Sequence, residues 1–387
     1  MKFYDKKNTL TKYALFFFGL FLALLPLLGG LGKVNNAFHI ALFIGLAIVY
    51  NKNSREELFS NTAYNLGLII TIIFLSYFSL SNLWGPQPNT LISELKHSFY
   101  IITFIVLFYF SILNGKKNTM LMLVFSSTIL LCILTFILVD KHAFLTMRLQ
   151  KGFPYAPENV IDMAGYYGIG IFCGLILIRE TGNKWLYLPI ALLFIGILLT
   201  QSRGPLLSLI ISCMPLLLLF KRVHLSHVFI TGLIVIAISL LIILSSADHI
   251  LLNRLEESYS QSYIRFGIWE NALSYVQQKP WFGWGFNQEI NFVNEIGQRV
   301  RTTHSLYFAT LLKGGVVGGL LLLSVIVYGL YMAWTQIKAN QSLEASMFVF
   351  SLMFYATQGM FLISNPSVPW VMFWLPLAVV MAIPKRQ

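Results

Sequence analysis

The stretch THSLYFATLLKGGVVGGLLLLSVIVYGL, residues 303–330, opens with a polar His-Ser pair and continues as a long apolar run. A run of about 20 apolar residues is enough for a helix to cross a membrane. At about 100° per residue, Gly315 lies about 20° and Gly318 about 40° from the direction of His304, so a continuous helix places the imidazole above a strip of glycine. The pattern predicts that this strip contacts a second helix or a lipid, with His304 where membrane meets water.

The composition of the whole chain agrees with that indication. Of its 387 residues, 57% are hydrophobic and only 11% are charged, and the mean hydropathy is +0.72. Such a chain has more apolar surface than a water-soluble core can bury, so we predict a polytopic membrane protein with membrane lipids as partners. The net charge of +12 would also suit a nucleic-acid binder, but membrane proteins concentrate Lys and Arg in cytoplasmic loops, and we predict no nucleic-acid partner.

Hydropathy divides the chain into twelve candidate spans separated by polar connections. They begin near residues 12, 36, 62, 98, 119, 161, 185, 205, 226, 305, 344 and 366. The sequence has no obvious internal repeat and no polar segment long enough to fold alone. We therefore expect an all-α polytopic membrane protein of about 12 transmembrane helices, with residues 1–387 forming a single membrane domain.

The positive charges predict the orientation of these spans. If the amino terminus is cytoplasmic, the short outside connections carry only Lys33, Lys96 and Arg203. This asymmetry predicts that both termini are cytoplasmic. Two outside segments carry more positive charge, a short loop at 140–160 and a long loop at 248–304 between the ninth and tenth spans. Long loops are translocated whatever their charge, but a cationic pocket for an anionic substrate would explain the same excess.

The long loop contains a stretch with helical periodicity. Ile264, Ile268, Ala272 and Val276 recur at about one helical turn, and Pro280 ends the pattern. The spacing predicts a short amphipathic helix at the membrane interface. An aromatic turn, WFGWGF at 281–286, follows it. Tryptophan at this depth usually anchors a protein to lipid headgroups, and the same aromatic faces are also suited to hold a sugar ring.

Arginine is concentrated in the same loop, at positions 254, 265, 299 and 301. His304 is therefore a titratable base close to permanent cations, a combination suited to chemistry on a phosphate-bearing lipid. Arg265 opens the expected helix, where it is suited to contact a phosphate or to snorkel to the interface. Lys313 lies about 180° around the helix from His304, so we expect it to pair elsewhere.

A second cationic motif, TQSRGP at 200–205, precedes the eighth span. Pro205 fits the first turn of a helix, where free backbone N–H groups together with Arg203 favour an anion. Ser-Arg-Gly alone is typical of a turn. The anion site is favoured because the motif lies on the same predicted side of the membrane as His304.

Other chemistries are disfavoured by the sequence. The chain has no Asp-x-Asp pair, no Walker loop and no dinucleotide-binding glycine pattern. Cys132, Cys173 and Cys213 all fall within apolar spans, where we interpret them as packing residues. We therefore predict no metal and no cofactor. A group transfer remains, in which arginines stabilise a leaving diphosphate.

These motifs, in this order, resemble the O-antigen ligase and polymerase family of bacterial membrane glycosyltransferases. The resemblance rests on Thr200–Gly204 before a span, on the Arg265 helix followed by Pro280 and Gly-Trp-Gly, and on His-Ser-x9-Gly-x-x-Gly. It covers about residues 200 to 320, whereas the first half is similar only in hydropathy. The His-Ser pattern is the element most typical of the ligases.

The resemblance implies a GT-C-like fold and an inverting, metal-independent transfer of a glycan from undecaprenyl diphosphate to a sugar hydroxyl of lipid A core. By matched position, His304 would deprotonate the acceptor hydroxyl and Arg265 would hold the diphosphate. Such an enzyme lies in the bacterial inner membrane, with its active site on the periplasmic side, and works among other lipopolysaccharide assembly proteins.

Further substrate contacts are assigned from a single motif or from position in the sequence. Arg203 would be a second contact to the diphosphate through the Ser-Arg-Gly match. Arg148 or Lys151, in the loop between the fifth and sixth spans, would be another. Arg299 and Arg301 are candidates because they are close to His304 in the sequence.

Three other functions remain compatible with the sequence. An O-antigen polymerase uses the same donor, with a second lipid-linked glycan as acceptor. A protein O-oligosaccharyltransferase transfers the glycan to a protein. A transporter or flippase of anionic lipids also combines twelve spans with cationic cavities, although here few charged residues lie inside the spans and the polar features gather on one side.

Overall fold

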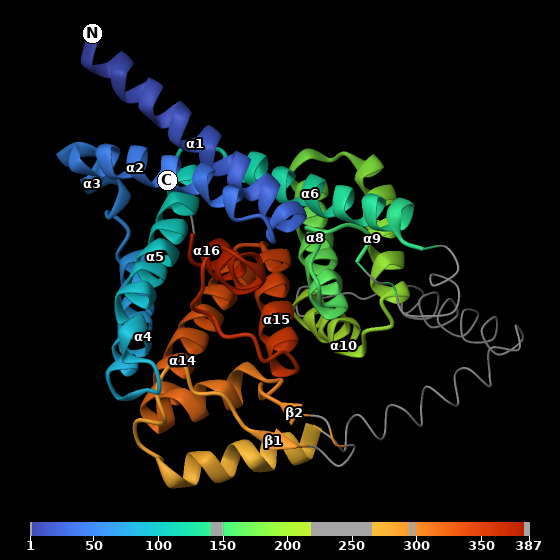
Figure 1. Cartoon of the computed structure of the whole chain (residues 1–387). Helices are drawn as coiled ribbons and strands as arrows, with labels where there is room; N and C mark the ends of the chain where they lie inside the picture. Colours follow the sequence, from blue (N-terminus) through green and yellow to red (C-terminus); the bar gives the residue numbers. More distant parts are fainter. Residues whose placement is uncertain are drawn as a thin grey trace, which may run out of the picture.

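The computed structural model describes residues 2–140, 149, 151–217, 265–293, 297 and 299–382 (Figure 1). Within these ranges the chain is mostly helical. The α-helices are α1 Lys2–Leu28, α2 Asn35–Tyr50, α3 Lys52–Leu58, α4 Thr62–Leu80, α5 Leu91–Leu113, α6 Lys117–Leu138, α8 Val160–Thr181, α9 Tyr187–Leu199, α10 Arg203–Ser212, α11 Met214–Leu217, α14 Leu306–Lys338, α15 Ser342–Ala356 and α16 Leu375–Met381. Residues 265–278 form one more helix, here called the loop helix.

The strands β1 Phe292–Val293 and β2 Arg299–Val300 form an antiparallel pair, with Phe292 opposite Val300. This hairpin, the loop helix and the first turns of α14 lie together at one end of the molecule, beside the connection from α4 to α5 (Figure 1). We call this end of the molecule the hairpin end.

Seven of the described helical segments are long and apolar enough to cross a membrane. They are Thr9–Leu28, Gly32–Tyr50, Thr62–Trp84, Pro88–Leu113, Lys117–Leu138, Val160–Thr181 and Leu306–Lys338. Shorter apolar helices occupy Lys184–Leu199, Arg203–Ser212, Ser342–Ala356 and Trp370–Met381. Each expected span coincides with one of these segments except the span near residue 226, which lies outside the described residues. The protein is accordingly an all-α, multi-pass membrane protein.

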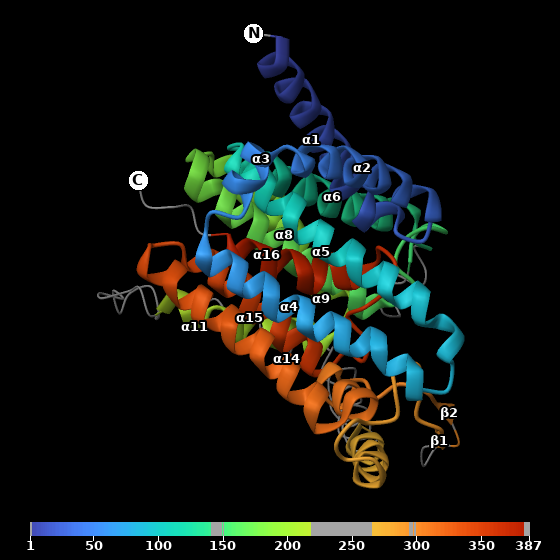
Figure 2. The same ribbon diagram turned by 90° about the vertical axis from the view of Figure 1, so that its left-hand side faces the viewer.

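The helices pack around the carboxy-terminal part of the chain. α14 contacts both α4 and α15, and Figure 2 shows α4 and α14 running side by side. Trp370 and Trp374 are fully buried in the π-helical turn Trp370–Trp374 before α16. Cys132 and Cys173 are buried, as predicted, but Cys213, directly after α10, is exposed.

The prediction of one continuous glycine strip along α14 is wrong, because the helix is broken at Gly315 (φ 60°, ψ −159°). The segment 280–285 completes the hydrogen bonds on both sides of the break. The Trp284 and Gly285 N–H groups donate to the carbonyls of Leu312 and Lys313 at 3.0 and 2.9 Å. The Val316 and Val317 N–H groups donate to the carbonyls of Pro280 and Trp281 at 2.7 and 3.1 Å.

The glycines at this break therefore have two different partners. A Cβ on Gly315 would collide with the carbonyl of Trp281, and its positive φ disfavours any other residue. Gly318 instead faces Phe78 of α4, so its expected contact with a second helix is confirmed. One face of the glycine pattern packs against a helix, and the other admits a loop.

A buried ion cluster lies at the far end of α14 from the hairpin. The Glu344 carboxylate is 0% exposed and accepts two hydrogen bonds from the Arg179 guanidinium, at 2.6 and 2.8 Å, and one from the Lys117 ammonium at 2.6 Å. These three side chains connect α6, α8 and α15. Because each charge has a partner of opposite sign, the cost of burying Glu344 is offset.

Candidate functional site

His304 lies directly before α14, at the hairpin end. Its backbone has a positive φ of 48°, which turns the chain between the hairpin and the helix. Thr303 and Ser305 on either side are buried, and the Thr303 hydroxyl donates to the Ser305 carbonyl at 2.7 Å. The His304 side chain between them is only half-buried. The fixed neighbours hold the backbone, while the imidazole remains accessible.

The loop helix is fastened to the chain around His304 by Trp269. The Trp269 indole N–H donates to the Thr303 carbonyl at 3.0 Å, and its ring stacks on Phe308 with centroids 5.2 Å apart. Ile268 and Ala272 are buried on the same face. The predicted helix with one buried face is therefore confirmed, and its position at a membrane interface stays a prediction.

Arg265 begins this helix and acts electrostatically on His304. Burial, and secondly the positive charge of Arg265, lower the pKa of His304 below its ordinary value. Burial also lowers the pKa of Arg265, but arginine stays charged at any physiological pH. The structure thus brings together a neutral imidazole, able to accept a proton, and a permanent cation, able to bind an anion.

Three consecutive residues of the connection from α15 to α16 join His304 to two other elements. Gly359 packs so closely that a Cβ there would lie 2.6 Å from the backbone nitrogen of His304. The Gln358 amide donates to the buried Asp162 carboxylate in the first turn of α8 at 2.7 Å. Thr357 lies against Gly204, where a Cβ would be 2.5 Å from its hydroxyl.

The sequence prediction missed this connection and Asp162. Asp162 and Gln358 are far apart in the sequence, and neither belongs to a motif. The available signal was a carboxylate in the first turn of an otherwise apolar span, because such a charge is expensive in a membrane unless it has a partner.

Arg203 lies near the same connection because its neighbour Gly204 packs against Thr357. Arg203 is the first residue of α10, and its side chain is exposed. Pro205 lies in the first turn of this helix, as predicted. Because Gly204 and His304 pack against residues only two apart in the sequence, Arg203 and His304 lie on the same side of the molecule.

The loop between α6 and α8 also reaches this side. The Leu149 N–H donates to the carbonyl of Leu199, the last residue of α9, at 3.1 Å. The exposed Lys151 ammonium lies 3.4 Å from the Glu158 carboxylate, which competes for its charge. Arg148 lies outside the described residues.

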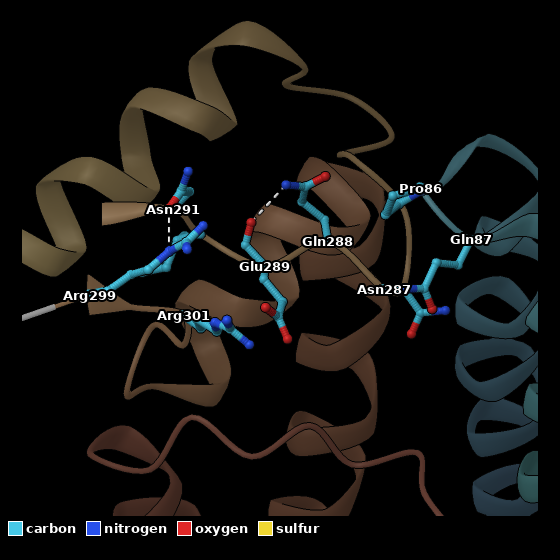
Figure 3. Close-up of a pocket in the computed structure, with 9 residues that line it drawn as sticks. Pro86, Gln87, Asn287, Gln288, Glu289, Asn291, Arg299 and Arg301 are labelled. Atoms are coloured by element: carbon cyan, nitrogen blue, oxygen red, sulfur yellow. Dashed lines mark hydrogen bonds between the residues drawn. The ribbon is translucent and has the colours of Figure 1, made fainter. Parts of the chain in front are cut away.

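Arg299 and Arg301 line a pocket that does not include His304. Both are exposed, on or directly after β2, and line a pocket of about 560 Å³ whose other walls are Pro86–Gln87 and 287–291 (Figure 3). His304 and Arg265 do not line this pocket. Of the predicted arginines that the structure describes, Arg265 and Arg203 therefore lie on the side of His304, whereas Arg299 and Arg301 line this pocket.

Lys313 and the aromatic turn have structural roles. The buried Lys313 ammonium donates to the carbonyls of Phe286 and Gln288, so it pairs away from His304 as predicted. Phe286 is buried, whereas Trp281 and Phe282 are 67% and 59% exposed. Of the aromatic turn, these two rings are the most exposed, and such rings are suited to contact lipid headgroups.

Comparison with known proteins gives three matches. Residues 188–323, which include Arg203, Arg265 and His304, match the family model described as O-antigen ligase. The chain is 24% identical to an O-antigen ligase of Pseudomonas aeruginosa over 82% of its own length and 78% of that protein. It is also 26% identical to a general O-oligosaccharyltransferase of Acinetobacter baylyi, over 34% of its length and 23% of that protein.

Proposed function

We propose, from the match of residues 188–323 to the O-antigen ligase family and the similarity to an O-antigen ligase over most of the chain, that this protein transfers a glycan from undecaprenyl diphosphate to a sugar hydroxyl of lipid A core. The observation that carries this proposal is the half-buried His304 imidazole, whose pKa is lowered by burial and by Arg265. A neutral imidazole is suited to take the proton of a hydroxyl.

The reaction is a single displacement without a metal. The polyprenyl tail enters sideways between spans, and Arg265 and Arg203 bind its diphosphate. His304 accepts the proton of the acceptor hydroxyl, whose oxygen forms a bond to the anomeric carbon. The bond from that carbon to the diphosphate breaks, and the arginines stabilise the charge that develops on the leaving group. One displacement inverts the anomeric carbon, so no covalent glycosyl-enzyme forms.

This proposal also assigns the location. The protein lies in the bacterial inner membrane as one domain, residues 1–387, with cytoplasmic termini and a periplasmic active site. The loops 140–160 and 248–304 face the periplasm, which agrees with the charge asymmetry of the short connections. Lys151 and Arg148 are further candidates for substrate contacts from the shorter loop.

A lipopolysaccharide gel from a strain lacking the gene tests the reaction. We expect bare lipid A core, with the polymer left on its lipid carrier, and a restored ladder on complementation. Core bearing a single repeat unit would indicate a polymerase instead. An unchanged ladder with lost protein glycosylation would indicate an O-oligosaccharyltransferase, the second candidate, which is favoured by the partial match to that class. An unchanged ladder and unchanged glycoproteins would point to lipid transport.

The pH dependence of transfer should report on Arg265. Because the base works only when neutral, kcat/KM, which reports the free enzyme, should rise with pH and reach half its maximum below pH about 6.5, the ordinary histidine pKa. Arg265→Gln removes one of the two causes of the lowered pKa, so the midpoint should move up toward the ordinary value. Arg265→Lys keeps the charge and should keep the lower midpoint. Identical midpoints in all three proteins would contradict the assigned electrostatic role of Arg265.

A further inference from the structure

The pocket between the α4–α5 connection and the hairpin has walls of unusual chemistry. Figure 3 shows Pro86 and Gln87 on one side, Arg299 and Arg301 on the other, and Gln288 and Glu289 between them. Pro86 and Ile290 are its only apolar lining residues among those the structure describes. The volume of about 560 Å³ is that of a typical small-molecule site.

The walls are held in place by hydrogen bonds between lining residues and residues that do not line the pocket. The Asn287 amide donates to the Asn82 side-chain oxygen at 2.9 Å and to the Thr90 hydroxyl at 2.7 Å, which ties the loop to the α4–α5 connection. The Lys313 ammonium holds the carbonyl of Gln288 at 3.1 Å. The pairing of β1 with β2 fixes the arginine side. The pocket is therefore built by the fold before any ligand arrives.

The two arginines outnumber the single carboxylate of the lining, Glu289, so the pocket keeps a net positive charge. Arg299 donates from Nε to the Asn291 side-chain oxygen at 3.0 Å, which orients its guanidinium. Neither Arg299 nor Arg301 forms an ion pair with a residue that the structure describes. Two guanidinium groups on one wall suit a carboxylate or phosphate, which they bind through paired hydrogen bonds.

The other walls favour a polyhydroxylated ligand over a bare anion. Side-chain amides both donate and accept hydrogen bonds, and the Glu289 carboxylate accepts them, so these groups match sugar hydroxyls. A polyprenyl tail would find almost no apolar surface here. The lining selects a saccharide that carries negative charge.

The position of the pocket connects it to the proposed reaction. Arg301 is three residues before His304, so their Cα atoms are at most about 11 Å apart. A saccharide bound along this wall would lie within a few sugar units of a hydroxyl at His304. The diphosphate has its own cations in Arg265 and Arg203. The pocket therefore lies where the sugar chain beyond the reacting unit would run.

We propose that this pocket binds an anionic saccharide, a sugar chain carrying phosphate or carboxylate groups, and so selects the substrates of the transfer. The proposal rests on the proposed function for its biological meaning. The charged sugars have two candidate sources, the phosphorylated core of the acceptor and acidic sugars of the donor glycan.

Equilibrium binding tests the pocket without requiring turnover. The probe is delipidated core oligosaccharide with its phosphates, titrated into the full chain in lipid nanodiscs. We expect Arg299→Gln with Arg301→Gln to weaken binding by about tenfold or more. Phosphatase-treated core should bind the wild type as weakly as intact core binds the double variant. Lys279→Gln removes an exposed cation of the same loop, outside the pocket, and should bind core like the wild type.

A turnover assay separates the two sources. If the acceptor supplies the anion, the double variant should show a raised KM for core and an unchanged kcat. If core binding is unchanged but the KM for a donor with acidic sugars rises, and that for a neutral donor does not, the pocket serves the donor. Unchanged core binding and unchanged KM values would overturn the pocket while leaving the transfer reaction in place. Arginine-dependent core binding by a wild-type protein that transfers nothing would uphold the pocket and reject the proposed function.

Discussion

Replacing His304 with alanine should reduce glycan transfer by about 10² to 10⁴-fold, the usual contribution of a general base. The substitution removes the proposed acceptor of the hydroxyl proton and leaves the arginines in place. The donor should therefore still bind, and the loss should appear in kcat and not in the KM of the lipid-linked glycan. Purified enzyme in nanodiscs with a defined lipid-linked donor gives this measurement.

The fold should survive this substitution. The His304 side chain is half-buried and makes no hydrogen bond to a residue that the structure describes, and Gly359 packs against its backbone instead of its ring. His39→Ala is a matched control, because His39 is another half-buried histidine, on α2, outside the site. It should retain transfer. A well-folded His304→Ala protein with full activity would require a different base, and the mechanism proposed for His304 would then be rejected.

The helices of this protein were predictable because the membrane makes hydropathy decisive. A spanning segment must be apolar and must satisfy its own backbone, and only a helix meets both conditions within one segment. The loop helix was equally predictable, since Ile268 and Ala272 repeat at the helical period and both are buried. For the spanning helices and the loop helix, the residues that decide the structure lie within the helix itself, so a local sequence pattern predicts it.

The break in α14 was not predictable from the same reasoning. The Gly-Gly pair at 314–315 lies inside an apolar run, and helical periodicity treats it as part of one face. The chain leaves the helix there because 280–285 offers two carbonyls and two N–H groups at that height. Those partners come from about thirty residues earlier in the sequence, so no local pattern contains them.

The candidate site was predictable only in its separate pieces. His304, Arg265 and Arg203 carry recognisable chemistry, and Arg265 does act electrostatically on His304. Gln358 and Gly359 join them, the first through its side-chain amide and the second because it has no side chain and packs closely. Neither residue type marks a functional site in a sequence. We also grouped Arg301 with His304 because they are close in the sequence, although Arg301 lines a pocket that His304 does not line.

Glu344→Ala should lower the free energy of unfolding by about 3 kcal/mol, the lower end of the range for breaking a buried ion pair. The substitution leaves Lys117 and Arg179 facing each other without their shared carboxylate. Their side chains are 21% and 27% exposed, so both can turn partly to solvent, which limits the loss. Thermal unfolding in detergent can be followed by reaction of the buried thiols of Cys132 and Cys173, in a Cys213→Ser background.

Glu180 provides a matched control within the same cluster. It accepts hydrogen bonds from Arg179 at 2.6 and 3.2 Å, but its side chain is 34% exposed. Glu180→Ala should therefore cost no more than about 1 kcal/mol, as for a surface pair. Equal losses for the two variants would show that burial adds nothing to the Glu344 interaction.

Because the cluster lies at the far end of α14 from His304, the fraction of Glu344→Ala protein that remains folded should transfer glycan at the wild-type rate. His304→Ala should do the opposite, losing the reaction and keeping the fold, so the pair of variants separates the chemistry of the hairpin end from the stability of the helix bundle.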